Sequence, residues 1–261
     1  MDFITVSSHN PEFYKKNNIA LEPHITRDES NPLWAQMIPF IKVVHLPYAS
    51  EHALNIAAYD DARRNADIAF LEASIQSARQ YNVERAIIHT CGFECIENEL
   101  VGCYERMIDA MKRLAKVAKM ANMTLCIENM VLRAPEKRHL YGSNAVEWLR
   151  IFDDVAEPNV RLTLDTSHAA SSVIPYATFE ERQRHIFDFL AKPERIAHVH
   201  WSDSRIATQG AMFADLHLVP GDGDLPISFH RQIKQLDATF TLEQHCGDED
   251  TLRGVNFIQG I

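Results

Sequence analysis

The sequence predicts an α/β fold, namely a (β/α)8 TIM barrel with eight parallel strands. Short β-branched apolar segments recur eight times along the 261 residues, and stretches with helical periodicity separate them. Barrels of this kind close as one domain at about 250 residues. Because the chain contains no linker or low-complexity stretch, we expect residues 1–261 to form a single TIM-barrel domain.

The expected strands are short and regularly spaced. They are residues 3–7, 19–23, 41–45, 85–89, 124–128, 161–165, 196–200 and 239–243. Eight such strands, each followed by room for a helix, favour a closed barrel over an open sheet. The first βα unit is shortened, because only residues 9–18 separate strands one and two, too few for a full barrel helix and two loops.

Between the strands, apolar side chains recur at helical spacing in two stripes. The stripes are Ile68, Leu71, Ile75 and Ala78, and then Tyr104, Met107, Met111, Leu114 and Ala118. We interpret both as core faces of barrel helices. Further along, Thr178 and Glu181 have the spacing of a capping box and predict the start of another helix.

Charge and composition limit the partners. The 36 acidic residues outnumber the 26 basic ones, and the net charge of -10 disfavours sequence-independent binding to a polyanion. Nucleic acid is thereby disfavoured but not excluded, since bound metal ions would add positive charge that the formal count omits. A small-molecule substrate fits this charge better.

The sequence lacks the usual signs of membrane insertion or secretion. No apolar run approaches the roughly 20 residues that cross a bilayer, and the start, MDFITVSSHN, lacks the features of a signal peptide. We therefore expect a cytoplasmic protein without membrane contact. The five cysteines are an odd number and should be reduced thiols, and the pair Cys91 and Cys95 lacks the second pair of a structural zinc site.

Six consecutive expected strands end in a side chain of a metal-binding type. These residues are His45, His89, Glu128, Asp165, His200 and Glu243. The carboxyl ends of barrel strands converge on one mouth, so we expect these side chains to lie together. Three further candidates, His168, Asp215 and His217, lie just beyond strand ends. Imidazole and carboxylate together suit zinc, manganese, cobalt or iron better than calcium or magnesium.

Each donor also has a purely structural explanation. A lone histidine at a strand end is more often a hydrogen-bonded core or rim residue, and Asp165 would serve to cap the following helix. Independent structural reasons would not place all of these residues at one level of the barrel, and this favours a metal site. His198 lies two residues before His200, so we expect it on the same face, one layer deeper, as a partner of the ligands.

Other polar residues are assigned less specific positions. His24, after strand two, is a weaker ligand candidate or a rim residue, and we expect three other histidines on the surface, namely His139, His185 and His230. Three cations, Arg133, Lys137 and Arg205, lie on loops expected over the mouth of the barrel. They would hold a substrate phosphate or hydroxyl, or form surface salt bridges.

Five strings of the chain resemble a known family. CIENM, LDTSHA, HVHWSD, DLHLVPGDGDLP and TLEQH, in this order, are similar to the xylose-isomerase-like TIM-barrel superfamily. That superfamily contains sugar and sugar-phosphate isomerases and epimerases, beside the endonuclease IV group of DNA-repair enzymes. The matching part extends from strand three to strand eight. Sugar epimerases of this kind are often dimers or tetramers, so the resemblance also implies a homo-oligomer.

In the sugar epimerases of the superfamily, a single divalent ion, often manganese, has four ligands from strands five to eight. The resemblance implies that these are Glu128, Asp165, His200 and Glu243. It further implies that Glu128 and Glu243 exchange protons with opposite faces of the carbon that is epimerised, through a metal-stabilised enediolate. His168, with His217 and Arg205, would bind the substrate.

The endonuclease IV group instead binds three zinc ions with nine ligands. The corresponding residues are His45, His89, Glu128, Asp165, His168, His200, Asp215, His217 and Glu243. The shortened first unit and the lack of a basic or aromatic cluster there disfavour a grip on duplex DNA. The sequence therefore favours a divalent-metal-dependent isomerase or epimerase of a small sugar or sugar phosphate. A multi-zinc phosphoester hydrolase is the alternative, and a catalytically silent binding protein is a third.

Overall fold

Eight parallel strands form one curled sheet in the computed structural model, which describes residues 2–6, 9–49, 53–91, 102–132, 140–207, 215–244 and 247–261. The strands are β1 (Phe3–Thr5), β2 (Ala20–Leu21), β3 (Val44–His45), β4 (Arg85–Ile88), β5 (Thr124–Glu128), β6 (Val160–Asp165), β7 (Ile196–Trp201) and β8 (Thr239–Leu242). Their order across the sheet is β2-β1-β8-β7-β6-β5-β4-β3. Every paired strand runs parallel to its neighbour.

The two edge strands of this sheet, β2 and β3, meet through isolated bridges. Leu21 bridges Ile41 and His24 bridges His45, both in parallel orientation. The amide of Lys42 donates to the carbonyl of Leu21 at 2.9 Å, and the amide of His45 donates to that of Pro23 at the same distance. We call this junction the β2–β3 seam. The predicted parallel (β/α)8 barrel is confirmed.

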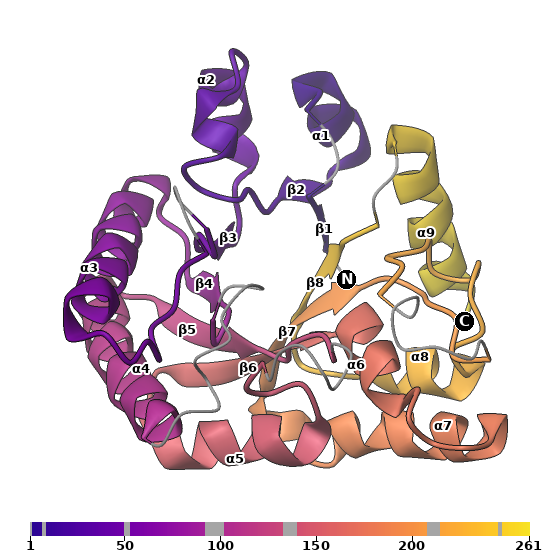
Figure 1. Cartoon of the computed structure of the whole chain (residues 1–261). Helices are drawn as coiled ribbons and strands as arrows, with labels where there is room; N and C mark the ends of the chain where they lie inside the picture. Colours follow the sequence, from indigo (N-terminus) through magenta and orange to yellow (C-terminus); the bar gives the residue numbers. More distant parts are fainter. Residues whose placement is uncertain are drawn as a thin grey trace.

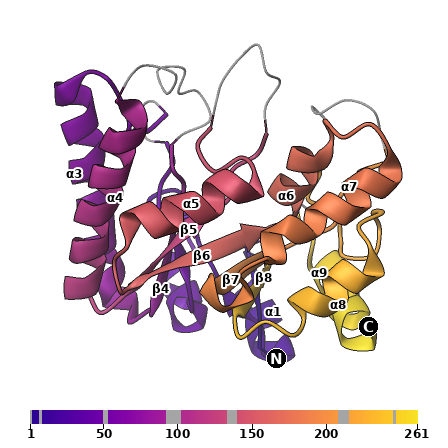
Figure 2. The ribbon, with the colours of Figure 1, turned by 90° about the horizontal axis from the view of Figure 1, so that it is seen from below.

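Helices surround the sheet (Figure 1). The α-helices are α1 (Pro11–Asn17), α2 (Trp34–Met37), α3 (Asp61–Ala78), α4 (Cys103–Met120), α5 (Ala145–Val155), α6 (Thr166–Val173), α7 (Phe179–His185), α8 (Ile227–Ile233) and α9 (Asp248–Gly260). Short 3-10 helices cover Asp28–Ser30, Ile38–Phe40, Arg79–Tyr81, Ile186–Leu190 and Pro193–Arg195. Helices α3 and α4 lie side by side, and α5 follows next to α4 (Figure 2).

The first βα unit is shortened, as predicted. Helix α1 has only 7 residues, from Pro11 under the cap of Asn10 to Asn17, and the next residue, Asn18, adopts the left-handed conformation with φ 52°. After β2 the chain forms only short helical turns before β3. Strand β2 has only 2 residues, and Pro23 has no amide proton that could continue its ladder.

The predicted apolar stripes form the contacts between helices and sheet. Ile68, Leu71, Ile75 and Ala78 of α3 are buried, and so is the stripe of α4 apart from Tyr104, which is partly buried. In α5, the fully buried indole of Trp148 donates from Nε1 to the carbonyl of Ile127 on β5 at 3.0 Å. No helix in the described ranges has the length and apolar character needed to traverse a bilayer.

Candidate metal centre

Four donors from neighbouring strands meet at the carboxyl ends of β5 to β8. Glu128, Asp165 and His200 lie at or near the ends of β5, β6 and β7, and Glu243 directly follows β8. The register pairs Asp165 with His200 across β6 and β7. One ligand atom from each of the four residues lies within 4.8 Å of the others, and all four residues are buried. We call these four residues the central group.

Two further groups of predicted donors adjoin the central group and share donors with it, beside a third group formed by Glu22, His198 and His200. His45 and His89 converge on Glu128, while His168 and His217 converge on Asp165. Asp215 is the ninth predicted donor, and its Oδ1 lies 3.0 Å from Nε2 of His217 and 3.8 Å from Nε2 of His168. The structure thus brings all nine donors named from the sequence into one continuous cluster.

Glu128 is at the middle of this cluster, in contact with four imidazoles. Its Oε2 lies 3.2 Å from Nε2 of His45 and 3.1 Å from Nε2 of His89. Its Oε1 lies 3.2 Å from Nδ1 of His200 and 3.3 Å from Nδ1 of His168. Burial alone would raise the pKa of Glu128, but the neighbouring imidazoles, His200 foremost, hold it well below its usual range.

The imidazoles respond in the opposite direction. Burial alone would lower the pKa of His200, yet Glu243, Glu22 and Glu128 raise it well above its usual range. The carboxylates around His168, led by Asp165, likewise raise its pKa against the effect of burial. Without a metal ion, the positive charge that balances the buried carboxylates is therefore carried by protonated imidazoles.

Two carboxylate oxygens of the central group fit a metal ion. Oδ2 of Asp165 and Oε2 of Glu243 are buried and make no hydrogen bond of suitable geometry within the described residues, although Nδ1 of His200 lies 3.8 Å from the first and 3.1 Å from the second. The other oxygen of Asp165, Oδ1, accepts from the amide of His168 at 2.7 Å and caps α6. Burial raises the pKa of Asp165 to about 7, against the lowering effect of His168 and His217. Buried carboxylate oxygens without donors are costly, and a bound cation would satisfy them.

Three imidazoles are also held in the orientation that metal ligands need. In each of them Nδ1 lies at hydrogen-bond distance from a backbone carbonyl, which only accepts, so Nδ1 carries a proton. The three contacts are His45 to the carbonyl of Leu46 at 2.8 Å, His168 to that of Asn129 at 2.8 Å, and His217 to that of Glu243 at 2.9 Å. Nε2 of His45 then faces Glu128 and Nε2 of His217 faces Asp215, whereas His168 also brings Nδ1 within 3.3 Å of Glu128.

His200 is held differently, by a residue that the sequence analysis did not single out. Its Nε2 contacts the carboxylate of Glu22 at 2.9 Å, and its Nδ1 faces the central group. Glu22 also contacts His198, which lies one layer deeper than His200, as predicted. The available signal was a carboxylate inside an apolar segment, since acidic residues are almost never fully buried unless they are paired.

Other predicted residues have mixed outcomes. The prediction that His230 lies on the surface is wrong, because His230 is 1% exposed and its Nδ1 accepts from the indole of Trp201 at 2.9 Å. His24 is partly buried and stacks on His45 with 4.4 Å between ring centroids. Arg205 is exposed on the segment after β7. Outside the described residues lie Arg133, Lys137, His139, Cys95 and Cys246.

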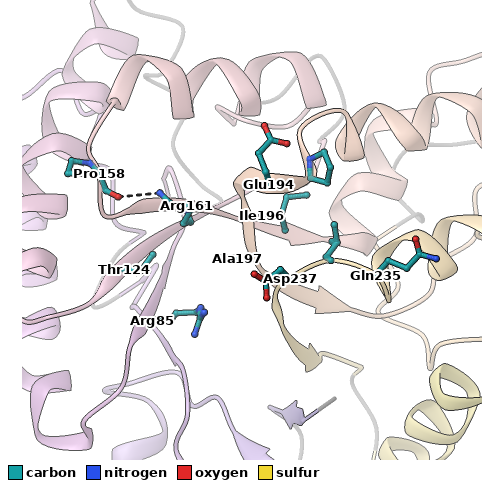
Figure 3. A pocket seen from close by; sticks show the side chains of 11 residues that line it. Arg85, Thr124, Pro158, Arg161, Glu194, Ile196, Ala197, Gln235 and Asp237 are labelled. Carbon is teal, nitrogen blue, oxygen red and sulfur yellow. Dashed lines mark hydrogen bonds between the residues drawn. The ribbon is translucent and has the colours of Figure 1, made fainter.

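A cavity of about 550 Å³ lies at the amino ends of the strands, opposite the donor cluster. Arg85, Thr124 and Ile196, which begin β4, β5 and β7, line it, and Arg161 donates there to the carbonyl of Pro158 (Figure 3). The donor cluster instead lies at the carboxyl ends of the strands, the face that bears the active site in TIM-barrel enzymes. The cluster, rather than this cavity, is therefore the candidate site.

A parallel barrel with histidine and carboxylate donors at the carboxyl ends of its strands defines a class of TIM barrels with a candidate metal site. Within this class, the sequence profile of the xylose isomerase-like TIM barrel matches residues 34–260, and the chain belongs to that family. Among curated proteins, none matches the sequence.

Solved structures similar to this chain share its fold over nearly their whole length. A D-tagatose 3-epimerase-like protein is 18% identical with a TM-score of 0.76, covering 100% of this chain and 96% of its own. D-psicose 3-epimerase from Clostridium cellulolyticum, with D-tagatose, is 15% identical with a TM-score of 0.71, covering 100% and 99%. The protein TTHB071 from Thermus thermophilus, soaked with ZnCl2, is 16% identical with a TM-score of 0.68, covering 100% and 97%.

Proposed function

We propose that this protein is a divalent-metal-dependent isomerase or epimerase of a small sugar or sugar phosphate, acting as a single barrel domain over residues 1–261. The central group carries the proposal, because four donors converge there within 4.8 Å and two of their buried oxygens make no hydrogen bond of suitable geometry within the described residues. The fold shared with a D-tagatose 3-epimerase-like protein and a D-psicose 3-epimerase supports the choice of substrate class.

Two carboxylates of the central group are suited to moving a proton between the faces of a substrate. Oε1 of Glu128 and Oε2 of Glu243 lie 3.2 and 3.1 Å from the same atom, Nδ1 of His200, and approach it from β5 and from the end of β8. Neighbouring imidazoles hold the pKa of both well below the usual range, against the effect of burial, so both are ionised at neutral pH.

In the proposed reaction, one ionised carboxylate removes the proton from the carbon next to a carbonyl. The other carboxylate takes up a proton from water before this step and delivers it to the opposite face, and the first then releases its proton to water. The net change is inversion at that carbon, with no gain or loss of atoms. Glu128, Asp165, His200 and Glu243 would hold a manganese or zinc ion, which supplies a Lewis acid for the developing negative charge on oxygen. His168, His217 and Arg205 are proposed to bind substrate oxygens.

The experiment combines metal content with an exchange assay. Protein stripped by a chelator is reloaded with Mn²⁺ or Zn²⁺ and incubated in D2O with D-psicose, D-tagatose, D-fructose and their phosphates. The expected result is a metal-dependent epimer that carries deuterium at the inverted carbon. If the loaded protein turns over none of these sugars, or if the chelated protein is equally active, the proposal is wrong.

A second candidate is a multi-zinc phosphoester hydrolase, and one observation favours it. Three groups of predicted donors adjoin one another, and the outer two contain His45 with His89 and His168 with His217. Clusters of metal ions suit phosphoester hydrolysis because they activate water and neutralise the leaving oxygen.

His45→Ala separates the two candidates, with His185→Ala as the matched control on α7. In an epimerase with one ion, His45→Ala should keep that ion and most of the turnover. In a hydrolase with three, it should lose one ion and at least about tenfold in the cleavage of a phosphodiester such as bis(p-nitrophenyl) phosphate. The number of ions per chain is measured by elemental analysis.

A further inference from the structure

Glu22 is a fully buried carboxylate in the interior of the barrel. It directly follows β2, and its amide donates to the carbonyl of Thr5 on β1 at 3.1 Å. Its exposed fraction is 0%, although charged side chains are rarely buried to this degree. The carboxylate therefore needs partners, and all those found come from β7 and β8 on the other side of β1.

Three donors surround the two oxygens of Glu22. Oε1 accepts from Nε2 of His200 at 2.9 Å. Oε2 accepts from Nε2 of His198 at 2.9 Å and from the hydroxyl of Thr241 at 2.5 Å. Because an ionised carboxylate only accepts, both imidazoles must carry a proton on Nε2.

This proton decides which nitrogen of His200 is left for the central group. With Nε2 bound to Glu22, Nδ1 lies 3.2 Å from Glu128 and 3.1 Å from Glu243. His45 and His217 present the other nitrogen, Nε2, to Glu128 and Asp215, and backbone carbonyls hold their rings. His200 is thus the member of the central group whose orientation depends on a charged side chain.

The cost of this arrangement argues against a merely structural explanation. A buried carboxylate loses several kcal/mol of hydration, and a well-packed apolar side chain would fill the same space at lower cost. A carboxylate behind a metal-binding imidazole, by contrast, fixes its tautomer and makes the ligand nitrogen more basic. The second partner, His198, is fixed in turn, because its Nδ1 lies 2.6 Å from the hydroxyl of Thr239.

We infer that Glu22 is a positioning residue that holds the proton on Nε2 of His200 and thereby directs Nδ1 to the metal ion. The inference rests on the metal dependence proposed above. Glu22 would thus support the four residues of the central group without contacting metal or substrate, and would act only through His200.

Cobalt binding tests the inference separately from activity. The chelated protein is titrated with Co²⁺, whose visible spectrum reports both affinity and ligand geometry. Glu22→Gln keeps the shape of the side chain but removes the charge, and we expect it to weaken Co²⁺ binding about 10- to 100-fold and to alter the spectrum. Thr241→Val is the matched control, because it removes a donor to Glu22 and leaves the contact with His200 intact. We expect it to change the affinity less than about threefold.

The outcomes separate this inference from the proposed function. If wild-type protein binds Co²⁺ and Glu22→Gln binds it within about twofold with the same spectrum, the role of Glu22 is refuted while metal dependence stands. If the wild-type protein binds no Co²⁺, metal dependence itself is refuted, and the inference with it. Should Glu22→Gln not fold, Glu22→Asp withdraws the carboxylate from His200 and keeps its charge. Unchanged Co²⁺ affinity in that variant refutes the inference equally.

Discussion

Raising the pH above neutrality should destabilise the metal-free protein through His217 and the other imidazoles whose pKa is raised, His168 and His200. Burial alone would lower the pKa of His217, but Asp165, Asp215 and Glu243 raise it from 6.5 to about 9. A histidine whose folded pKa exceeds its unfolded value stabilises the fold fully below the unfolded value, here 6.5. This stabilisation is lost as the pH rises through the folded value, here about 9.

The size of the effect follows from that difference. At about 1.4 kcal/mol per pH unit, the rise from 6.5 to about 9 corresponds to about 3 kcal/mol of unfolding free energy. The side chain of His217 is only 7% exposed, so solvent screens little of this. His168 and His200, whose pKa values are also raised, should shift the stability in the same direction. Glu128 and Glu243 are ionised throughout this range, so they do not make the unfolding free energy depend on pH there.

Metal loading should reverse the dependence of the unfolding free energy on pH, so that stability rises with pH. A metal ion binds the neutral imidazole, so rising pH removes competing protons and strengthens binding. The assay is urea denaturation of chelated and Zn²⁺-loaded protein between pH 6.5 and 9.5, with His217→Gln as the variant that cannot titrate. A stability of the metal-free protein that stays flat across this range would contradict the reasoning. So would a His217→Gln variant that keeps the full slope.

Three further predictions concern single side chains. Glu243→Gln should lower kcat at least about 100-fold because it removes a proton-transferring carboxylate, and undiminished turnover would remove Glu243 from the mechanism. Gly223→Ala should cost about 1–3 kcal/mol in calorimetry, because its Cβ would overlap the carbonyl of Ser204 and the carboxylate of Asp203. An unchanged Tm would show that this loop relaxes. Arg205→Ala should raise KM about fivefold or more and leave kcat within about twofold, whereas an unchanged KM would exclude Arg205 from substrate binding.

The donors could be predicted from the sequence because their positions follow from a single rule. Parallel strands in a barrel deliver their carboxyl ends to one face, so residues such as Glu128 and Asp165 meet although they lie far apart along the chain. Strand bounds follow apolar runs, and the predicted bounds of β5 match the observed ones at both ends. Helix faces could be predicted for the same reason, since the stripes of α3 and α4 have the period of the helix.

Glu22 and His230 could not be predicted in this way. Candidate donors are expected at the last residue of each predicted strand. The second expected strand ends at Pro23, so Glu22, one residue earlier, is not among them. That Glu22 points inward toward His200 depends on the curvature of the closed barrel, which no local pattern records. His230 has the polar character of a surface helix residue, and only the packing of α8 against Trp201 buries it.

The β2–β3 seam has a consequence for the lifetime of the metal-bound protein. Elsewhere continuous ladders join the strands, whereas isolated bridges join these two. The amides of Lys42 and His45 should therefore exchange their hydrogens with solvent sooner than those of β5 to β7. His45 lies on one side of this junction and Glu22 follows β2 on the other, and both reach the donors. A bound ion would stabilise the junction through these contacts. Dissociation of the ion and local opening of the barrel at the seam would then occur together, with one rate.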